Sequence, residues 1–284
     1  MTAALTPAAI ERFGHEGYLT GIAALGADEV ARFLDTTERF EAEHPRDAGW
    51  AFDIKCNLLF DWVYANGAHP GILAPVSQLI GPDILLTDSV FRIKPPGSAV
   101  SYGWHQDSAR ILVDPLPVIV YMAFSAATVE NGCLAVIPGT HKSVAPFDLI
   151  SNPSQPNRKV ARVRDPDSGR AVSLELEPGE IAIFSANLMH GSPANRARER
   201  RVAVLHDYTA TRARQSVGFG SGQLVMGLDR HGNFGHEPAP GPDFEANAET
   251  RRRILNLYPE NILMGPLEPG QKPDFPDRPV GRAT

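Results

Sequence analysis

The feature that most constrains the fold is the stretch from residue 84 to 209, where short apolar and β-branched runs follow one another. Gly, Pro and Asn separate the runs, and no helical pattern lies between them. The runs are ILLTDSVFRIK, PVIVYMAFSA, CLAVIP, AVSLELEP, EIAIFSA and RVAVLHDYT. Successive strands without intervening helices favour a sandwich or barrel over a doubly wound α/β sheet. A Pro-rich, polar insertion at 146–169 interrupts the series, and such a long loop is more often functional than ordinary.

Apolar residues at helical spacing predict helices outside this region, over 6–17, 27–44, 70–80 and 246–257. Helices are therefore expected mainly before the strands, with one more near the end. The final Pro-rich stretch, 266–279, is expected to lie over the surface or to fray.

Composition excludes several classes of partner. The chain is 43% apolar and 21% charged, as in ordinary globular proteins. A net charge of −6 provides no basic field for phosphates, so nucleic acid is not an expected partner. No apolar stretch is long enough to span a bilayer, and the N-terminus lacks the pattern of a secretory signal. Two cysteines, Cys56 and Cys133, are too few for a disulfide framework, so a cytoplasmic location is expected.

The stretch GWHQD at 103–107 places His105 and Asp107 two residues apart. In an extended strand these side chains project from the same face and can bind one metal ion together. The pair alone is weak, because a solvated turn with a hydrogen-bonded histidine has the same sequence.

A third ligand is offered by His190, which ends an apolar run. The loop SPANRARE then leads into RRVAVLHDY, which reads as a hairpin turning at Asn195-Arg196. This register predicts that His190 faces Arg201 across the ladder, with Ser192 on the same face.

Each of these side chains has a chemical use. Two imidazoles and one carboxylate on one face of an octahedral ion leave three positions open, as in non-haem Fe(II) oxygenases. A 2-oxo acid and dioxygen can fill them. A five-carbon 2-oxo diacid also needs a planar cation for its far carboxylate, which Arg201 provides, and Ser192 adds a donor. A zinc hydrolase or isomerase also fits the triad but leaves Arg201 unexplained, and a non-catalytic small-molecule binder is a second alternative.

In several motifs the chain resembles the phytanoyl-CoA dioxygenase-like (PhyH) family of Fe(II)/2-oxoglutarate oxygenases. They are RFGHEGYL, FRIKPPG with WHQD, ATVENGCLAVIPGTHK, PGE…HGSPAN…RR and LDRHGNFGHEPAPGPDF. The family pattern HxD…H…R, with the arginine eleven residues after the second histidine, is met at His190 and Arg201.

This resemblance implies a mainly β double-stranded β-helix, a jelly-roll barrel flanked by N-terminal helices. It makes His105, Asp107 and His190 the iron ligands, and gives the distal carboxylate of 2-oxoglutarate to Arg201 and Ser192. The expected reaction consumes O2, hydroxylates or otherwise oxidises a small molecule at an unactivated C–H bond, and releases succinate and CO2. Because Asp107 stands where related halogenases have a small residue, hydroxylation is favoured over halogenation.

The implied organisation is one oxygenase domain, 1–284. Its parts are a mainly helical segment at 1–82, a jelly-roll core at 83–210 with the insertion 146–169, and a C-terminal lid or tail at 211–284. The DRHGNFGHEP segment, with His231 and His236, is expected to fold as the lid over the barrel mouth.

Several further residues keep two readings. Lys94 either reaches 2-oxoglutarate or is a solvated edge lysine. His141 either orders a turn or supports a ligand. His206 is structural or lines a pocket, and it cannot share a site with Asp207 because adjacent strand residues face opposite sides. Trp104 and Gln106 flank His105 and are expected on the opposite side of the strand, so packing is favoured for Trp104, with a cosubstrate contact as the alternative if the strand kinks.

The substrate is expected to be a small specialised metabolite. Its walls are predicted at 50–64 and at 146–169, where Arg158 and Lys159 could meet an anionic group or be solvated. The aromatic residues suggest a partly apolar pocket, but they are expected in the core more than at the substrate; they are Phe52, Phe60, Trp62 and Phe91. The sequence carries no signal for the substrate's identity or for oligomeric state.

Overall fold

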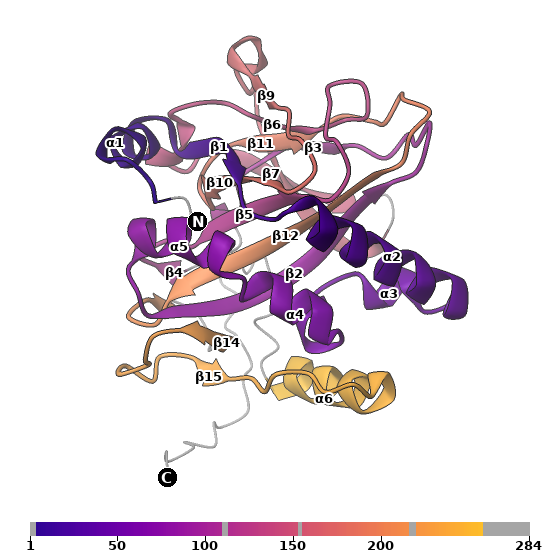
Figure 1. Cartoon of the computed structure of the whole chain (residues 1–284). Coiled ribbons are helices and arrows are strands. Elements are labelled where there is room, and N and C mark those ends of the chain that lie inside the picture. The colour runs from indigo at the N-terminus through magenta and orange to yellow at the C-terminus, as the bar shows by residue number, and fades with distance from the viewer. Residues whose placement is uncertain (1–3, 110–112, 153–154, 216–219, 258–284) are drawn as a thin grey trace.

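The computed structural model describes residues 4–109, 113–152, 155–215 and 220–257. Two β-sheets face each other at its centre, and helices cover the outer side of the larger sheet (Figure 1). This arrangement, with helices in the N-terminal part, confirms the predicted double-stranded β-helix fold.

Within the described residues the larger sheet has seven strands. In spatial order they are β1 (Tyr18–Ala23), β10 (Glu180–Ser185), β5 (Val118–Ala123), β12 (Arg201–Ala210), β2 (Ile84–Lys94), β14 (Ser221–Met226) and β15 (Gly235–His236). The smaller sheet, in order, contains β3 (Tyr102–His105), β11 (His190–Ser192), β6 (Leu134–Val136) and β9 (Val172–Leu174). Two further pairs join β13 (Arg214–Gln215) to β4 (Val113–Asp114), and β7 (Phe147–Asn152) to β8 (Gln155–Val163). Every pairing is antiparallel except β14 with β15.

The helices are α1 (Pro7–Glu16), α2 (Ala27–Glu43), α3 (Ala48–Ala51), α4 (Asp61–Gly67), α5 (Pro70–Ile80) and α6 (Phe244–Leu257). The local sequence explains the bounds of α1. Thr6 Oγ1 accepts from the Ala9 backbone N at 3.2 Å, Pro7 occupies the first turn, and Gly17 ends the helix at φ +85°. A glycine at a positive φ is the usual helix terminator because it has no Cβ to clash.

Strand alternation gives the larger sheet two different faces. On β12, Val202 and Val204 pack against the helices, whereas Ala203 and Leu205 pack between the two sheets. One apolar cluster therefore joins helices to sheet and a second joins sheet to sheet. Consequently the odd-numbered side chains from Arg201 to Asp207 face the barrel interior.

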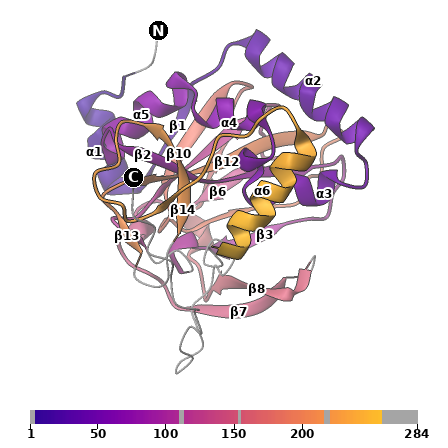
Figure 2. The same cartoon turned by 90° about the horizontal axis from the view of Figure 1, so that it is seen from below.

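The insertion at 146–169 contains a β-hairpin, not an irregular loop. Strands β7 and β8 pair antiparallel, and β8 runs beside β3 at the edge of the molecule (Figure 2). Ala161 and Val163 alternate as buried residues, while Arg162 and Arg164 between and beyond them are exposed. The Pro and Asn residues at 152–157 obscure this short alternation in the sequence. The side chains of Arg158 and Lys159, and the Pro-rich stretch 266–279, lie outside what the structure describes.

Candidate metal centre

Three potential metal ligands meet at one edge of the smaller sheet. His105 ends β3 and His190 begins β11, and the two residues are directly paired across the strands. Asp107 lies just beyond β3, where a single helical turn begins. The ligand atoms of the three side chains all lie within 4.8 Å of one another. His105 Nε2 is 3.5 Å from Asp107 Oδ1, and His190 Nε2 is 3.5 Å from Asp107 Oδ2.

His105 and Asp107 come together through a backbone conformation that differs from the expected extended strand. A continuous strand through 105–107 is wrong, because β3 ends at His105. Gln106 causes the bend: its buried amide donates to the carbonyls of Thr140, Ser143 and Asn187 and accepts from the Ala145 backbone N. Gln106 is therefore packed away from the ligands, as predicted, and it fixes the turn that presents Asp107.

Backbone carbonyls orient both imidazoles. His105 Nδ1 lies 2.7 Å from the Gly103 carbonyl, and His190 Nδ1 lies 2.9 Å from the Leu188 carbonyl. A carbonyl only accepts, so each Nδ1 carries a proton, and each Nε2 is the nitrogen turned toward Asp107. Burial, and next the charge of His105, lower the pKa of His190 to about 4. A neutral histidine is the form that binds a metal.

A second polar cluster joins the two sheets near the triad. Ser192 on β11 accepts a hydrogen bond from Lys94 Nζ on β2 at 2.6 Å and one from Arg201 Nη1 on β12 at 3.2 Å. The Ser192 hydroxyl itself donates to the Gly132 carbonyl at 2.8 Å, and the same carbonyl accepts from Arg201 Nη1. Lys94 and Arg201 are paired across β2 and β12, and each is 1% exposed. Lys94 is thus a buried residue of this cluster, not a solvated edge lysine.

The predicted hairpin between His190 and Arg201 is wrong. β11 pairs with β3 and β6 in the smaller sheet, whereas β12 pairs with β2 and β5 in the larger one. The segment 193–200 crosses from one sheet to the other. Ser192 and Arg201 still meet, because the Arg201 side chain points into the space between the sheets.

The Lys94–Arg201 pair has no counter-charge in the described part of the chain. Neither cation forms an ion pair there, and Arg201 Nε is buried without a hydrogen-bond partner. Burial, followed by the Arg201 charge, lowers the pKa of Lys94 to about 7. Two buried cations side by side are costly unless an anion joins them, so the cluster fits an anionic ligand.

The inner wall below this cluster carries charges that sequence reasoning missed. Asp88 on β2 and Asp207 on β12 are directly paired. The Lys55 backbone N donates to Asp88 Oδ1 at 2.5 Å. Burial raises the pKa of both carboxyl groups, and the charge of Asp107 further raises that of Asp207. The sequence signal for these two residues was an aspartate within an otherwise apolar strand, Asp88 in TDSV and Asp207 in VLHDY.

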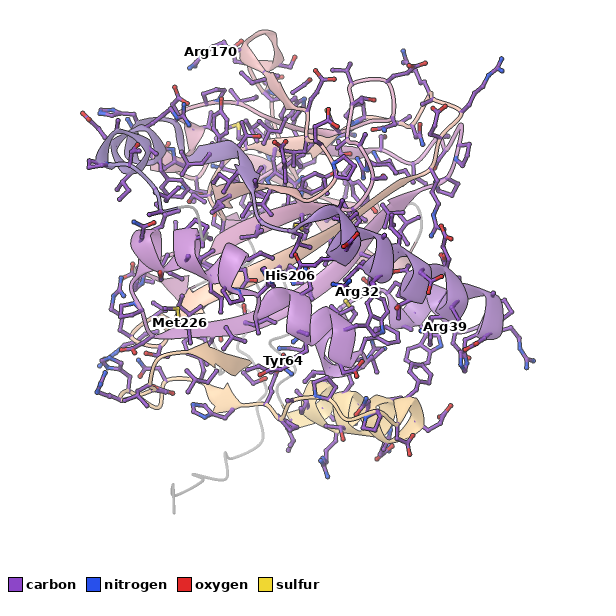
Figure 3. All side chains as sticks on the ribbon, viewed as in Figure 1. Arg32, Arg39, Tyr64, Arg170, His206 and Met226 are labelled. Atoms are coloured by element: carbon purple, nitrogen blue, oxygen red, sulfur yellow. The ribbon has the colours of Figure 1, made fainter. Side chains whose placement is uncertain are left out.

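His206 is structural. It lies on the helix-facing side of β12, beside α4 (Figure 3), with Nδ1 2.8 Å from Ser89 Oγ and Nε2 2.8 Å from Asn66 Oδ1. Burial lowers its pKa to about 3. Asp207 faces the opposite side of the sheet, as the alternation required. His141 lies in the turn Thr140–Lys142, where its carbonyl accepts from Asn187 Nδ2, so the turn-forming reading fits.

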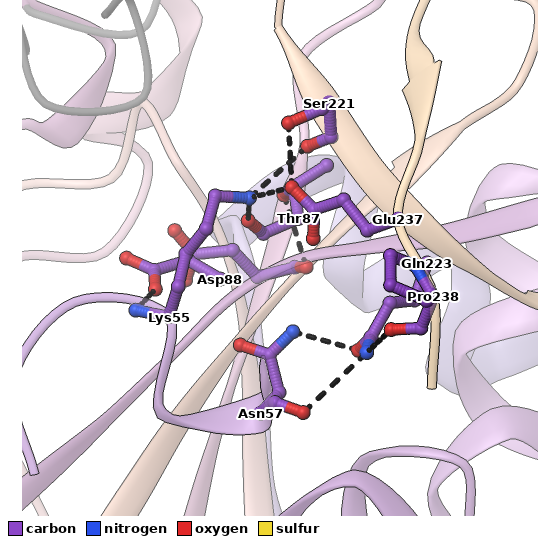
Figure 4. Close-up of polar contacts among 9 residues, drawn as sticks. Lys55, Asn57, Thr87, Asp88, Ser221, Gln223, Glu237 and Pro238 are labelled. Carbon is purple, nitrogen blue, oxygen red and sulfur yellow. Dashed lines mark hydrogen bonds and ion pairs between the residues drawn. The ribbon is translucent and has the colours of Figure 1, made fainter. Parts of the chain in front are cut away.

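The predicted lid segment is joined firmly to the core. Glu237 Oε1 accepts from Lys55 Nζ at 2.6 Å and from Ser221 Oγ at 2.5 Å (Figure 4). The side chains of Lys55 and Glu237 are 1% and 0% exposed. Nearby, Gln223 Oε1 accepts from Asn57 Nδ2 at 2.7 Å. Residues 235–238 are therefore a fixed support for the 50–64 segment. His231 and His236 lie on its exposed side.

The aromatic rings of Phe52, Phe60 and Trp62 in the 50–64 segment pack between the helices and the larger sheet. Phe52 and Phe60 belong to the apolar cluster between the helices and the larger sheet, together with Phe91, and Trp62 packs against it. The prediction that these rings are core residues is confirmed. Among the described helices, none combines the length and apolar character that a membrane span requires.

Comparison with known proteins places the chain in a family. The family model for phytanoyl-CoA dioxygenase (PhyH) matches residues 13–203, a range that includes the triad, Ser192 and Arg201. A probable phytanoyl-CoA dioxygenase from Caenorhabditis elegans is 32% identical over 150 residues, which cover 49% of this chain and 48% of that protein. This chain therefore spans about half the length of such curated relatives.

Two further relatives cover more of the chain. The ectoine dioxygenase of Stutzerimonas stutzeri (strain A1501) is 26% identical over 231 residues, covering 70% of this chain and 75% of that one. The solved structure of the non-heme monooxygenase ThoJ in its apo form superposes with a TM-score of 0.78 at 25% identity, over 89% of this chain and 96% of the other. The chain belongs to the phytanoyl-CoA dioxygenase (PhyH) family.

Proposed function

We propose that this protein is an Fe(II)- and 2-oxoglutarate-dependent dioxygenase that oxidises a small-molecule metabolite, releasing succinate and CO2. The observation that carries the proposal is the pairing of two sites in one barrel. One is a His-Asp-His triad suited to a divalent metal, and the other is a buried cation pair for which the described residues supply no anion. A zinc hydrolase needs the triad but has no use for Lys94 and Arg201 at this place.

In this proposal His105, Asp107 and His190 hold the metal, and a backbone carbonyl fixes the orientation of each imidazole. Arg201 and Lys94 bind the distal carboxylate of 2-oxoglutarate, and Ser192 holds both cations in place. Bound Fe(II) with its 2-oxo acid activates dioxygen for the oxidation of a C–H bond. The chain orients the cosubstrate and keeps water out of the barrel.

The substrate we propose is small and polar. The wall next to the triad carries Asp88, Asp207 and Arg92, all on the inner faces of β2 and β12. A long acyl chain would have to desolvate these charges without pairing them, which is costly. The relation to an ectoine dioxygenase is consistent with a small polar metabolite. We also propose hydroxylation as the reaction and the cytoplasm as the compartment, since Cys56 and Cys133 are both free and buried.

The test is an anaerobic titration of metal-free protein with Fe(II) and then 2-oxoglutarate, followed by the visible charge-transfer absorption of a chelated 2-oxo acid. The matched variants are Arg201→Ala and Arg200→Ala. Arg200 is the adjacent arginine on the outer face, bound to Glu41 at 2.6 Å and 2.7 Å.

We expect a band in the native protein and in Arg200→Ala. Arg201→Ala should need at least about 100-fold more 2-oxoglutarate, because a buried charge-assisted contact contributes about 3 kcal/mol or more. Absence of a band in the native protein, together with tight zinc binding, would refute the oxygenase and favour a hydrolase or isomerase.

A further inference from the structure

We infer that the substrate is a small zwitterion, whose anionic group binds Arg92 and whose basic nitrogen binds between Asp88 and Asp207. This inference rests on the proposed function and deepens it, because it names the charge pattern of the substrate. Three charged side chains on the barrel wall carry it, and the HxD…H…R pattern includes none of them.

The three side chains lie on one inner surface, and the strand register holds their opposite charges apart. Asp88 of β2 is directly paired with Asp207 of β12, and Arg92 lies four residues further along β2. Four residues of strand span about 13 Å. Val90 and Leu205, which are paired with each other, form the inward pair between them. Within the described residues Arg92 forms no ion pair with either aspartate. A ligand with two opposite charges can therefore bridge the gap.

The acidic pair lacks a cation among the described residues. Asp88 accepts one hydrogen bond there, from the Lys55 backbone N, and the Asp207 carboxyl group takes part in no hydrogen bond or ion pair. The Lys55 ammonium is directed elsewhere, to two backbone carbonyls and to Glu237 (Figure 4). Like charges directly opposite each other on paired strands are destabilising. A ligand that supplies a positive charge removes this destabilisation.

The chemistry that fits the acidic pair is a protonated amine. Asp88 and Asp207 are half-buried, so part of each side chain is not covered by protein. Burial raises the pKa of both carboxyl groups, and the charge of Asp88 further raises that of Asp207. A cation between the two groups favours their ionised forms and offsets this effect. A protonated amine supplies both the charge and the N–H donors that two carboxylates accept.

Arg92 is the complementary half of the site. Its guanidinium carbon lies 5.3 Å from the centre of the Tyr102 ring, so the side chain reaches across to β3, the strand that ends at His105. Its one hydrogen bond within the described residues goes to the Phe91 carbonyl at 3.2 Å. Most of its five N–H donors are therefore free for an anionic group, which a guanidinium binds in a bidentate manner.

This charged wall adjoins the metal centre. Burial, and to a smaller extent the charge of Arg92, lower the pKa of His190. Burial, and further the charge of Asp107, raise the pKa of Asp207. Because such effects fall off with distance, the wall and the triad share one interior space. A molecule bound between Arg92 and the acidic pair is thus placed beside the metal ligands, where oxidation occurs in the proposed function.

The experiment uses probes that differ only in charge. They are 5-aminopentanoate, pentanoate and 1-aminopentane, with the corresponding four-carbon and six-carbon sets alongside. The protein is loaded with Fe(II) and excess 2-oxoglutarate under anaerobic conditions, so that the acids cannot occupy the Lys94–Arg201 pair. The visible band of the chelated 2-oxo acid is recorded first, and dissociation constants of the probes are then measured by calorimetric titration of the same sample.

Two variants of the wall are compared with two matched controls. Asp207→Asn and Arg92→Met each remove one charge from the barrel interior. Asp35→Asn and Arg39→Met remove the same charges from α2, on the outer side of the larger sheet, where the two side chains are 79% and 59% exposed. The control variants change the net charge equally but leave the barrel interior intact.

We expect native protein to bind at least one zwitterion about 10-fold or more tightly than the acid and the amine of the same length, since a hydrogen bond to a charged group contributes this much. Asp207→Asn should reduce the affinity for the zwitterion to that for the acid. Arg92→Met should reduce it to that for the amine. Neither control variant should change any of these affinities.

Equal affinity of native protein for each zwitterion and its singly charged parents would overturn the inference. So would an equal loss for zwitterion and acid in Asp207→Asn, because the substitution would then act on the fold and not on the basic nitrogen. If the band of the chelated 2-oxo acid is absent, the proposed function itself fails. A band without any preference for a zwitterion refutes this inference alone.

Discussion

The affinity for 2-oxoglutarate is expected to fall as the pH rises above neutrality, because its binding requires a protonated Lys94. Burial and the Arg201 charge lower the pKa of Lys94 from 10.5 to about 7 in the protein without ligand. A bound carboxylate favours the ammonium form and raises that pKa again. The proton is therefore taken up on binding whenever the pH lies between the two values.

The sign and size follow from linkage. Below pH 7 Lys94 is already charged, and binding is strongest. At pH 8 only about a tenth of the free protein carries the proton, and at pH 9 about a hundredth, so the dissociation constant rises about tenfold per pH unit. Other groups around Lys94 do not titrate in this window. The pKa of Tyr121 is about 12 and that of Cys133 about 11.

The assay is calorimetric titration of Fe(II)-loaded protein with 2-oxoglutarate from pH 6.5 to 9, in buffers of different ionisation enthalpy. Native protein should take up close to one proton at pH 8. Lys94→Met should bind weakly, with no uptake and no slope above pH 7. A flat profile for native protein, or the same slope in Lys94→Met, would show that Lys94 stays charged or does not touch the ligand.

Two further predictions concern the buried charged residues Lys55, Glu237 and Asp207. Lys55→Met should lower the free energy of unfolding, measured in urea, by about 3–5 kcal/mol, because it leaves Glu237 buried without its cationic partner. The double variant Lys55→Met/Glu237→Gln should recover part of this loss. A loss below about 1 kcal/mol for Lys55→Met would contradict the ion pair. Asp207→Asn should stabilise the protein more at pH 7 than at pH 4.5. The pKa of Asp207 is higher in the folded than in the unfolded protein, so the native protein loses stability as the pH rises from the unfolded-state pKa to the folded-state pKa. Asparagine has no proton to lose and avoids this loss. Equal melting temperatures of the variant and the native protein at pH 7 would count against the raised pKa.

The site residues at strand ends could be predicted from the sequence, because their side-chain chemistry identifies them even when the local backbone conformation is predicted incorrectly. His105, Asp107 and His190 come together although Asp107 lies in a turn and not in the strand that the two-residue spacing suggested. Imidazole and carboxylate side chains are the usual ligands of such metals, so these three residues could be identified without knowing the order of the strands.

Strand order is where the sequence was least informative. A two-residue period states which side chains share a face, but it does not state which sheet a strand joins. The segment after His190 reads equally well as a hairpin loop and as a crossing between sheets. Arg201 reaches Ser192 only because the crossing places β12 opposite β11. The contact between Arg201 and Ser192 was therefore predicted correctly, although the hairpin register from which it was predicted is wrong.

Contacts between distant segments were invisible for a related reason. Lys55 and Glu237 are 182 residues apart, and neither belongs to a periodic pattern. The pairing of Asp88 with Asp207 cannot be predicted without the exact register of β2 and β12, which is irregular next to Asp207. A shift of one residue would turn one of the two side chains to the helix side of the sheet. Local rules predict elements, whereas such pairs depend on the assembled sheet.

The assembled register also orders charge along the barrel interior. Successive pairs on the inner face of β2 and β12 run from Lys94 with Arg201, through Arg92 with Ala203, to Asp88 with Asp207. Six residues of strand span about 20 Å, so the cationic and acidic ends are well separated. In the proposed function the cationic end attracts the distal carboxylate of 2-oxoglutarate. Burial raises the pKa of both carboxyl groups at the other end, which favours their neutral forms, so we expect this end to be left to the substrate.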